Sequence, residues 1–171
     1  MDPHFNYENF REKYFKVNAG NVITPNYDDC NLETTFTIDK KSINKGTASI
    51  DSKTGEITAN KYGTVTVTAL VGEGKYARKT TTKVRVYDPV INTGKKASVM
   101  VGKTLKASVK NGVKTTTDWK TSNEDIATVD DRGRIKGVSV GTVRISCVNN
   151  GKTISKEITV IDTHFDANLK W

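Results

Sequence analysis

The sequence predicts an all-β protein made of two tandem β-sandwich domains. Thr, Val, Ile and Gly are prominent, and apolar stripes with the period of a helix are scarce. Two stretches also repeat one another, since 48–57 followed by 63–67 resembles 127–135 followed by 141–145. The copies lie 78 residues apart, which is too long for a solenoid repeat and fits one small domain.

The repeat sets the expected limits of the domains. We expect an N-terminal arm over 1–14, a first domain over 15–88, a second domain over 89–162 and a tail over 163–171. The joint falls at Pro89, because proline ends strand pairing and stiffens the chain.

The first domain contains short runs that favour strands. Val65 alternates with Val67 and Ala69, which places one face of this run inward. Glycines in 71–75 predict a hairpin loop. The expected strands are 35–38, 47–50, 56–59, 64–69 and 83–86.

The second domain repeats the pattern more clearly. Its expected strands are 97–101, 104–109, 116–119, 126–129, 134–136, 142–147 and 153–161. Asn149, Asn150 and Gly151 predict a turn with left-handed backbone. About seven short strands separated by turns are typical of an immunoglobulin-like sandwich.

Both ends of the chain carry large apolar residues. Tyr7, Phe10 and Tyr14 have helical spacing, so they predict a short amphipathic helix that packs on the first domain or docks on another subunit. The tail needs a surface on the second domain or on a partner. The expected docking residues are Phe5, Tyr7, Phe10, Tyr14, Phe165, Leu169 and Trp171.

The net charge of +8 is uneven along the chain. Residues 89–162 carry 13 Lys and Arg against seven Asp and Glu, whereas 15–88 carry 11 against eight. Such an excess favours an acidic partner, such as nucleic acid, teichoic acid or an acidic capsid surface. Because the lysines alternate with apolar residues and are not interleaved with aromatic ones, we interpret them as a solvated sheet face and expect no specific nucleic-acid binding.

The sequence offers no residue set for catalysis or metal binding. The two histidines, His4 and His164, lie at opposite ends of the chain, and nucleophilic catalysis needs a His beside Cys or Ser. Cys30 and Cys147 fall in different domains, and Cys147 is in phase with the apolar residues before it, so we expect a buried thiol. We expect no enzyme activity, cofactor or metal.

No apolar run approaches the length of a membrane span. The first residues also lack the basic region and the apolar core of a signal peptide. We therefore expect either a protein made without an export signal or a segment of a longer exported protein.

A set of spaced residues in the second domain resembles the bacterial immunoglobulin-like group 2 family. The matching elements are Trp119, Ser122 with Asn123, 127–130, Gly133, Ile135, Gly137 and 141–145. The first domain carries the likeness over 48–69 and lacks the Trp and the Ser-Asn pair.

The resemblance implies a spacer, adhesive or decoration module without catalytic residues. It also implies that the motif residues fill cores or shape turns: Trp119, Val129, Asp130, Gly133, Ile135, Gly141, Gly55 and Gly63. Domains of this family occur in surface adhesins, cell-wall proteins, and capsid and tail proteins of bacteriophages.

The sequence as a whole predicts a non-enzymatic structural protein of a bacteriophage virion, as a capsid decoration or tail-associated protein. Its partners would be capsid or tail subunits, with a host-surface glycan as a further ligand. The alternative is an adhesive or cell-wall-binding fragment of an exported protein at the bacterial cell surface.

Overall fold

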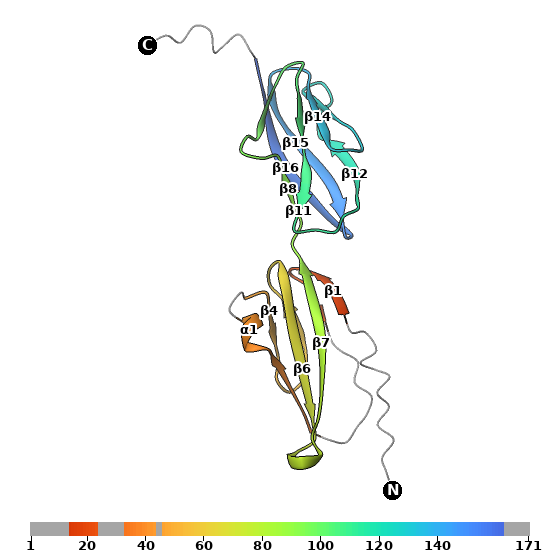
Figure 1. Ribbon diagram of the computed structural model, residues 1–171. Coiled ribbons are helices and arrows are strands. Elements are labelled where there is room, and N and C mark those ends of the chain that lie inside the picture. The colour runs from red at the N-terminus through yellow and green to blue at the C-terminus, as the bar shows by residue number, and fades with distance from the viewer. Residues whose placement is uncertain (1–13, 24–32, 44–45, 163–171) are drawn as a thin grey trace, which may run out of the picture. The chain divides into compact units, whose positions relative to one another are not determined.

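The computed structural model describes residues 14–23, 33–43 and 46–162 (Figure 1). These residues form strands joined by turns, with one short helix, α1 (Lys40–Ile43), and one 3-10 turn, η2 (Gly74–Tyr76). The all-β fold class predicted from the sequence is confirmed. The chain divides into two compact units, unit 1 (Met1–Asp88) and unit 2 (Pro89–Trp171).

The described residues of unit 1 form two sheets. Its strands are β1 (Tyr14–Asn18), β2 (Val22–Ile23), β3 (Thr34–Ile38), β4 (Ala48–Ile50), β5 (Ile57–Ala59), β6 (Gly63–Val71) and β7 (Arg78–Tyr87). A four-stranded sheet has the order β1-β7-β6-β3, and β1 runs parallel to β7. The other sheet has the order β2-β5-β4.

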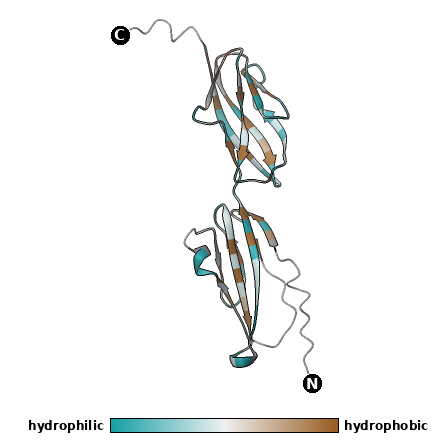
Figure 2. Cartoon of the chain, viewed as in Figure 1, coloured by the Kyte–Doolittle hydropathy of each residue, from teal (hydrophilic) through white to brown (hydrophobic). Residues whose placement is uncertain are grey.

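Alternation along the strands builds the core of unit 1. In β6, Val65 and Val67 are buried, whereas Thr64 between Gly63 and Val65 is exposed. Figure 2 shows the same alternation as changes of colour along β6 and β7. The buried cluster is Val17, Ile38, Ala48, Ile57, Ala59, Val65, Val67, Val84 and Val86.

Unit 2 is built in the same way. Its strands are β8 (Val90–Asn92), β9 (Ser98–Met100), β10 (Thr104–Lys106), β11 (Ser108–Lys110), β12 (Thr116–Thr121), β13 (Ala127–Val129), β14 (Arg134–Gly137), β15 (Gly141–Asn149) and β16 (Lys152–Ile161). The sheets have the orders β12-β15-β16-β9, β10-β14-β13 and β11-β8. The buried cluster is Ile91, Val99, Ala107, Ala127, Ile135, Val143, Ile145, Cys147, Ile154, Ile158 and Val160.

The two units share one strand order. The four-stranded sheet β9-β16-β15-β12 matches β1-β7-β6-β3, and each has its parallel strand at the same edge. The sheet β10-β14-β13 matches β2-β5-β4. In unit 2 the strands β8 and β11 also pair; the positions of unit 1 that correspond to them lie outside the described residues.

Two sequence predictions about strands are wrong. The strand expected over 104–109 is split, because buried Ala107 turns the chain from β10, which pairs with β14, to β11, which pairs with β8. Tyr14, expected in a helical arm, begins β1 opposite Lys83. Pairing with β7 gives this segment backbone hydrogen bonds that outweigh a three-residue helical spacing. The rest of the expected arm and the tail lie outside the described residues.

Candidate interaction surface

The two repeated turns are built by aspartates. The carboxylate of Asp51 accepts hydrogen bonds from the backbone N–H of Thr54 at 2.7 Å and of Lys53 at 2.9 Å. These bonds hold the pKa of Asp51 below its usual value, with the Thr54 bond contributing most. The following residue, Gly55, has φ +72°, a left-handed conformation that favours glycine.

Asp130 does the same in unit 2. Its carboxylate accepts from the backbone N–H groups of Arg134 at 2.8 Å and Arg132 at 3.0 Å, and Arg134 Nε donates to it at 2.6 Å. The bonds from Arg134 lower the pKa of Asp130 most. Both aspartates therefore stabilise turns and lie in no cluster of acidic groups suited to general acid or base chemistry.

The motif glycines lie where chain segments approach closely. A Cβ on Gly133 would lie 2.9 Å from the Ala107 carbonyl oxygen and 2.9 Å from Trp119. A Cβ on Gly141 would lie 2.9 Å from Ile126, and one on Gly63 would collide with Thr47. Close packing explains the glycines at these positions, and at Gly133 the left-handed φ of +72° also favours glycine.

The other motif residues also serve the fold. Ile135 is fully buried in unit 2, whereas Trp119 and Val129 are half-buried and pack against the cluster from its border. Val129 also lines a shallow depression on the sheet β10-β14-β13.

Asn149, which the sequence placed in a turn, is a buried residue at the end of β15. Asn150 and Gly151 have the expected left-handed backbone, with φ of 51° and 72°, but Asn149 ends β15 and its side chain is 1% exposed. Its Nδ2 donates to the carbonyls of Val113 and Thr115, each at 3.0 Å, and its Oδ1 accepts from the N–H of Val113 at 2.9 Å. The period of two along β15 places Asn149 on the core face and could have identified it.

The Cys147 thiol lies in the core of unit 2, as its phase predicted, and is 1% exposed. Burial raises its pKa from 9.0 to about 11, because the thiolate would lose its hydration. The folded-state pKa is the higher one, so its contribution to stability is complete below pH 9 and is lost as the pH rises toward 11.

We expect the unfolding free energy of unit 2 to fall by about 1 kcal/mol between pH 9 and pH 10 through this thiol, at roughly 1.4 kcal/mol per unit of difference in pKa. Urea unfolding of the wild type and of Cys147→Ala at pH 8, 9 and 10 would measure it. The two proteins share every lysine, so lysine titration cancels. A difference between them that stays constant with pH would contradict the prediction.

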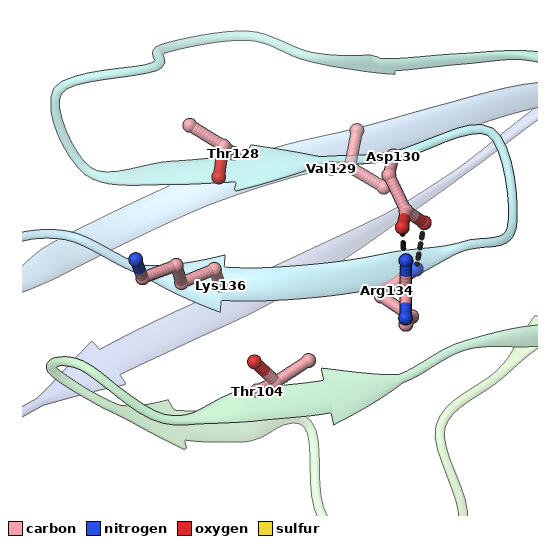
Figure 3. A pocket seen from close by; sticks show the side chains of 6 residues that line it. All are labelled: Thr104, Thr128, Val129, Asp130, Arg134 and Lys136. Carbon is pink, nitrogen blue, oxygen red and sulfur yellow. Dashed lines mark hydrogen bonds and ion pairs between the residues drawn. The ribbon is translucent and has the colours of Figure 1, made fainter.

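A shallow depression lies on the sheet β10-β14-β13 and is lined by two cations and one carboxylate. Figure 3 shows Thr104, Thr128, Val129, Asp130, Arg134 and Lys136 around it, with Arg134 paired to Asp130. Its threonines and both cations are exposed, and the remaining two residues are only half-buried. It therefore has the character of a solvated sheet face, and it lacks the enclosure of a substrate pocket.

Exposed apolar residues gather at one end of unit 2. We call this set the end patch: Met100, Val101, Val138, Val140 and Ile161, which are 36% to 61% exposed. Met100 pairs with Ile161, and the N–H of Val101 donates to the Ile161 carbonyl at 2.9 Å. Val101 also bridges to Gly137, directly before Val138. Contiguous apolar surface of this kind marks an interaction site more often than single exposed residues do.

Other site types were sought in the described residues. They contain no group of three His, Cys, Asp or Glu side chains that could hold a metal ion. Across 14–23, 33–43 and 46–162, no helix has the length and apolar character needed to cross a bilayer. The predicted docking residues Phe5, Tyr7, Phe10, Phe165, Leu169 and Trp171 lie outside this range, as do Cys30 and both histidines.

Unit 2 has the architecture of an immunoglobulin-like domain. Its sheets enclose a buried aliphatic core, and its motif residues form turns or pack against this core. Residues 86–160 match the family model described as bacterial Ig-like domain (group 2). This match confirms the resemblance that the sequence motif of the second domain predicted.

Two curated proteins resemble parts of the chain. An uncharacterized protein of Clostridium acetobutylicum is 33% identical over 137 residues, which are 75% of this chain and 14% of that protein. The 3-O-alpha-D-galactosyl-alpha-L-arabinofuranosidase of Bifidobacterium longum subsp. longum is 42% identical over 74 residues, which are 39% of this chain and 6% of the enzyme. The matched segments thus span only a small part of these relatives.

Two solved structures resemble the chain in fold. The D00-D0 domain of intimin is 15% identical, with 86% of this chain and 96% of that chain covered and a TM-score of 0.49. The C-terminal 282-residue fragment of intimin, in complex with the intimin-binding domain of the translocated intimin receptor, is 20% identical. That comparison covers 75% of this chain and 51% of the other, with a TM-score of 0.48.

Proposed function

We propose that the chain is a non-enzymatic interaction protein whose two Ig-like units serve attachment to a protein partner at a bacterial surface. The proposal rests on one observation: the motif and apolar side chains of both units serve the core and the turns. Apolar residues fill both cores, the motif aspartates and glycines shape turns, and the charged residues Asp130, Arg134 and Lys136 lie on an open sheet face. Catalysis requires ionisable groups gathered in an enclosed site, whereas attachment requires exposed faces on a rigid scaffold.

The relatives support the same function. A domain that occupies 6% of an arabinofuranosidase fits an accessory role better than a catalytic one. Unit 1 is then a divergent copy of unit 2, because the two share a strand order and the repeated turn, and the tandem domains extend over 15–88 and 89–162. The sequence also predicts a second version of this function, in which the chain attaches to a virion and its partners are capsid or tail subunits.

The N-terminal arm supplies the docking residues in this proposal: Phe5, Tyr7 and Phe10. Deleting residues 1–13 is the suitable test, because Tyr14 already pairs in β1. We expect the truncated protein to keep both folded units and to lose retention at its native location.

The location is measured with an antibody against unit 2, on intact cells treated with protease and on purified phage particles. Protease-sensitive signal at the cell surface is expected, and deletion of 163–171 serves as the matched control, since it should leave retention unchanged. Signal only in particles would favour the virion form. Signal only in the soluble fraction, or full retention after loss of 1–13, would contradict the proposal.

A further inference from the structure

The end patch is formed by three chain segments that meet at the end of unit 2. Gly141 pairs with Val160, so Val140 and Ile161 follow this pair at adjacent strand ends. Ile161 in turn pairs with Met100 on the other side. Their neighbours Val99 and Val160 are 6% and 0% exposed, so Met100 and Ile161 point away from the core. The result is a row of aliphatic side chains across three strands.

Unit 1 provides an internal comparison, because its backbone has the same hydrogen bonds at the same end. Asn18 pairs with Tyr87 as Met100 pairs with Ile161. The N–H of Ala19 donates to the Tyr87 carbonyl at 2.7 Å, as that of Val101 does to Ile161 at 2.9 Å. The five matching positions in unit 1 are Asn18, Ala19, Asn60, Tyr62 and Tyr87.

Unit 1 does not present an aliphatic surface there. Two of the five residues are asparagines, and the exposed ring of Tyr62 is occupied by Arg85, whose Nη2 donates to Tyr62 Oη at 2.6 Å. The fold therefore does not require apolar residues at these positions. The aliphatic set is confined to the unit that is followed by residues 163–171.

We infer that the end patch is the docking surface for the chain's own C-terminal segment, whose Phe165, Leu169 and Trp171 cover Met100, Val101, Val138, Val140 and Ile161. The segment leaves from the patch itself, since Ile161 is a member and Asp162 is the last described residue. Nine residues span up to about 30 Å when extended, so the segment reaches every member. It supplies three large apolar groups to a surface made only of aliphatic ones.

The tether favours this occupant over a second copy or a separate partner. Because the segment belongs to the same chain and follows the patch directly, its effective concentration at the patch is roughly millimolar, far above that of a protein in dilute solution. The end patch has no charged member that would select an ionic ligand, and the segment carries only Asp166 and Lys170 as charges. The end patch is therefore suited to bind the segment through apolar contacts.

Methyl NMR of the full chain tests the inference. We expect Trp171→Ser to remove ring-current shifts from the methyl groups of Val138, Val140 and Ile161, and to leave the methyl group of Ala19 in unit 1 unchanged. Conversely, Val138→Ser with Val140→Ser should raise acrylamide quenching of Trp171, followed in a Trp119→Phe background. Both valines are exposed, at 44% and 61%, so the units stay folded.

Two substitutions control for unspecific effects. Phe10→Ser removes an aromatic residue at the other end of the chain, and Leu70→Ser removes an apolar residue that is 42% exposed in unit 1. Neither should move the patch methyls or the Trp171 quenching. Patch methyls that ignore Trp171→Ser would overturn the inference. It would also be overturned by patch shifts that depend on protein concentration together with a dimer in sedimentation, which would assign the patch to a second copy.

Discussion

Ile57→Ala and Ile135→Ala are each expected to lower the unfolding free energy of their own unit by about 2–5 kcal/mol. Ile57 lies in β5 and Ile135 in β14, the central strands of the two three-stranded sheets, and both are 0% exposed. The substitution removes buried apolar contact and leaves a cavity that the neighbouring strands cannot close. Each loss is a large fraction of the stability of a domain of this size.

Hydrogen exchange resolved by mass spectrometry separates the two effects. Peptides from β6 and β7 report on unit 1, and those from β15 and β16 report on unit 2. We expect Ile57→Ala to accelerate exchange only in the first set and Ile135→Ala only in the second. Lys136→Ala, at the exposed position after Ile135, is the control and should change stability by about 0.5 kcal/mol or less. Faster exchange in both units after a single substitution would show that they unfold as one.

The sequence predicted the long strands well because their pattern is local. In β6 and β15 a period of two runs over nine residues and is bounded by glycine at the start, so the alternating apolar residues suffice to place a strand with one buried face. The prediction of one strand over 104–109 was wrong because the break in this run depends on non-local pairing. Nothing local distinguishes the two halves of this run, and only the partners β14 and β8 show that they belong to different sheets.

The candidate surface was harder to predict than the fold. Met100, Val138, Val140 and Ile161 are ordinary aliphatic residues in three separate segments, and each taken alone fits a core position. Their exposure follows from the register that pairs Met100 with Ile161 and from the bridge at Val101. Register depends on pairing between distant segments and is not visible in a single run of sequence. Asp130, by contrast, bonds to residues at most four positions away, so the sequence motif sufficed to predict its place in a turn.

Asn149→Ala is expected to lower the unfolding free energy of unit 2 by about 3 kcal/mol. The side chain is 1% exposed and anchors the loop before β12 through Val113, Thr115 and the hydroxyl of Thr116. Alanine would leave the N–H of Val113 and two backbone carbonyls without this partner in a part-buried site. Each buried polar group left unsatisfied costs about 1–3 kcal/mol.

Urea unfolding followed by Trp119 fluorescence, in a Trp171→Phe background, measures this loss in unit 2. Asn150→Ala is the matched control: the neighbouring residue is exposed with φ +51°, so its replacement adds the strain of a left-handed backbone, about 1 kcal/mol. Asn149→Asp separates hydrogen bonding from packing, because aspartate has nearly the same shape but cannot donate when ionised. If the anchor acts through its amide donors, Asn149→Asp destabilises at least as much as Asn149→Ala at neutral pH and recovers part of the loss when the carboxylate is protonated. If Asn149→Ala and Asn150→Ala lowered the unfolding free energy equally, Asn149 would not act as a special anchor and the prediction would be wrong.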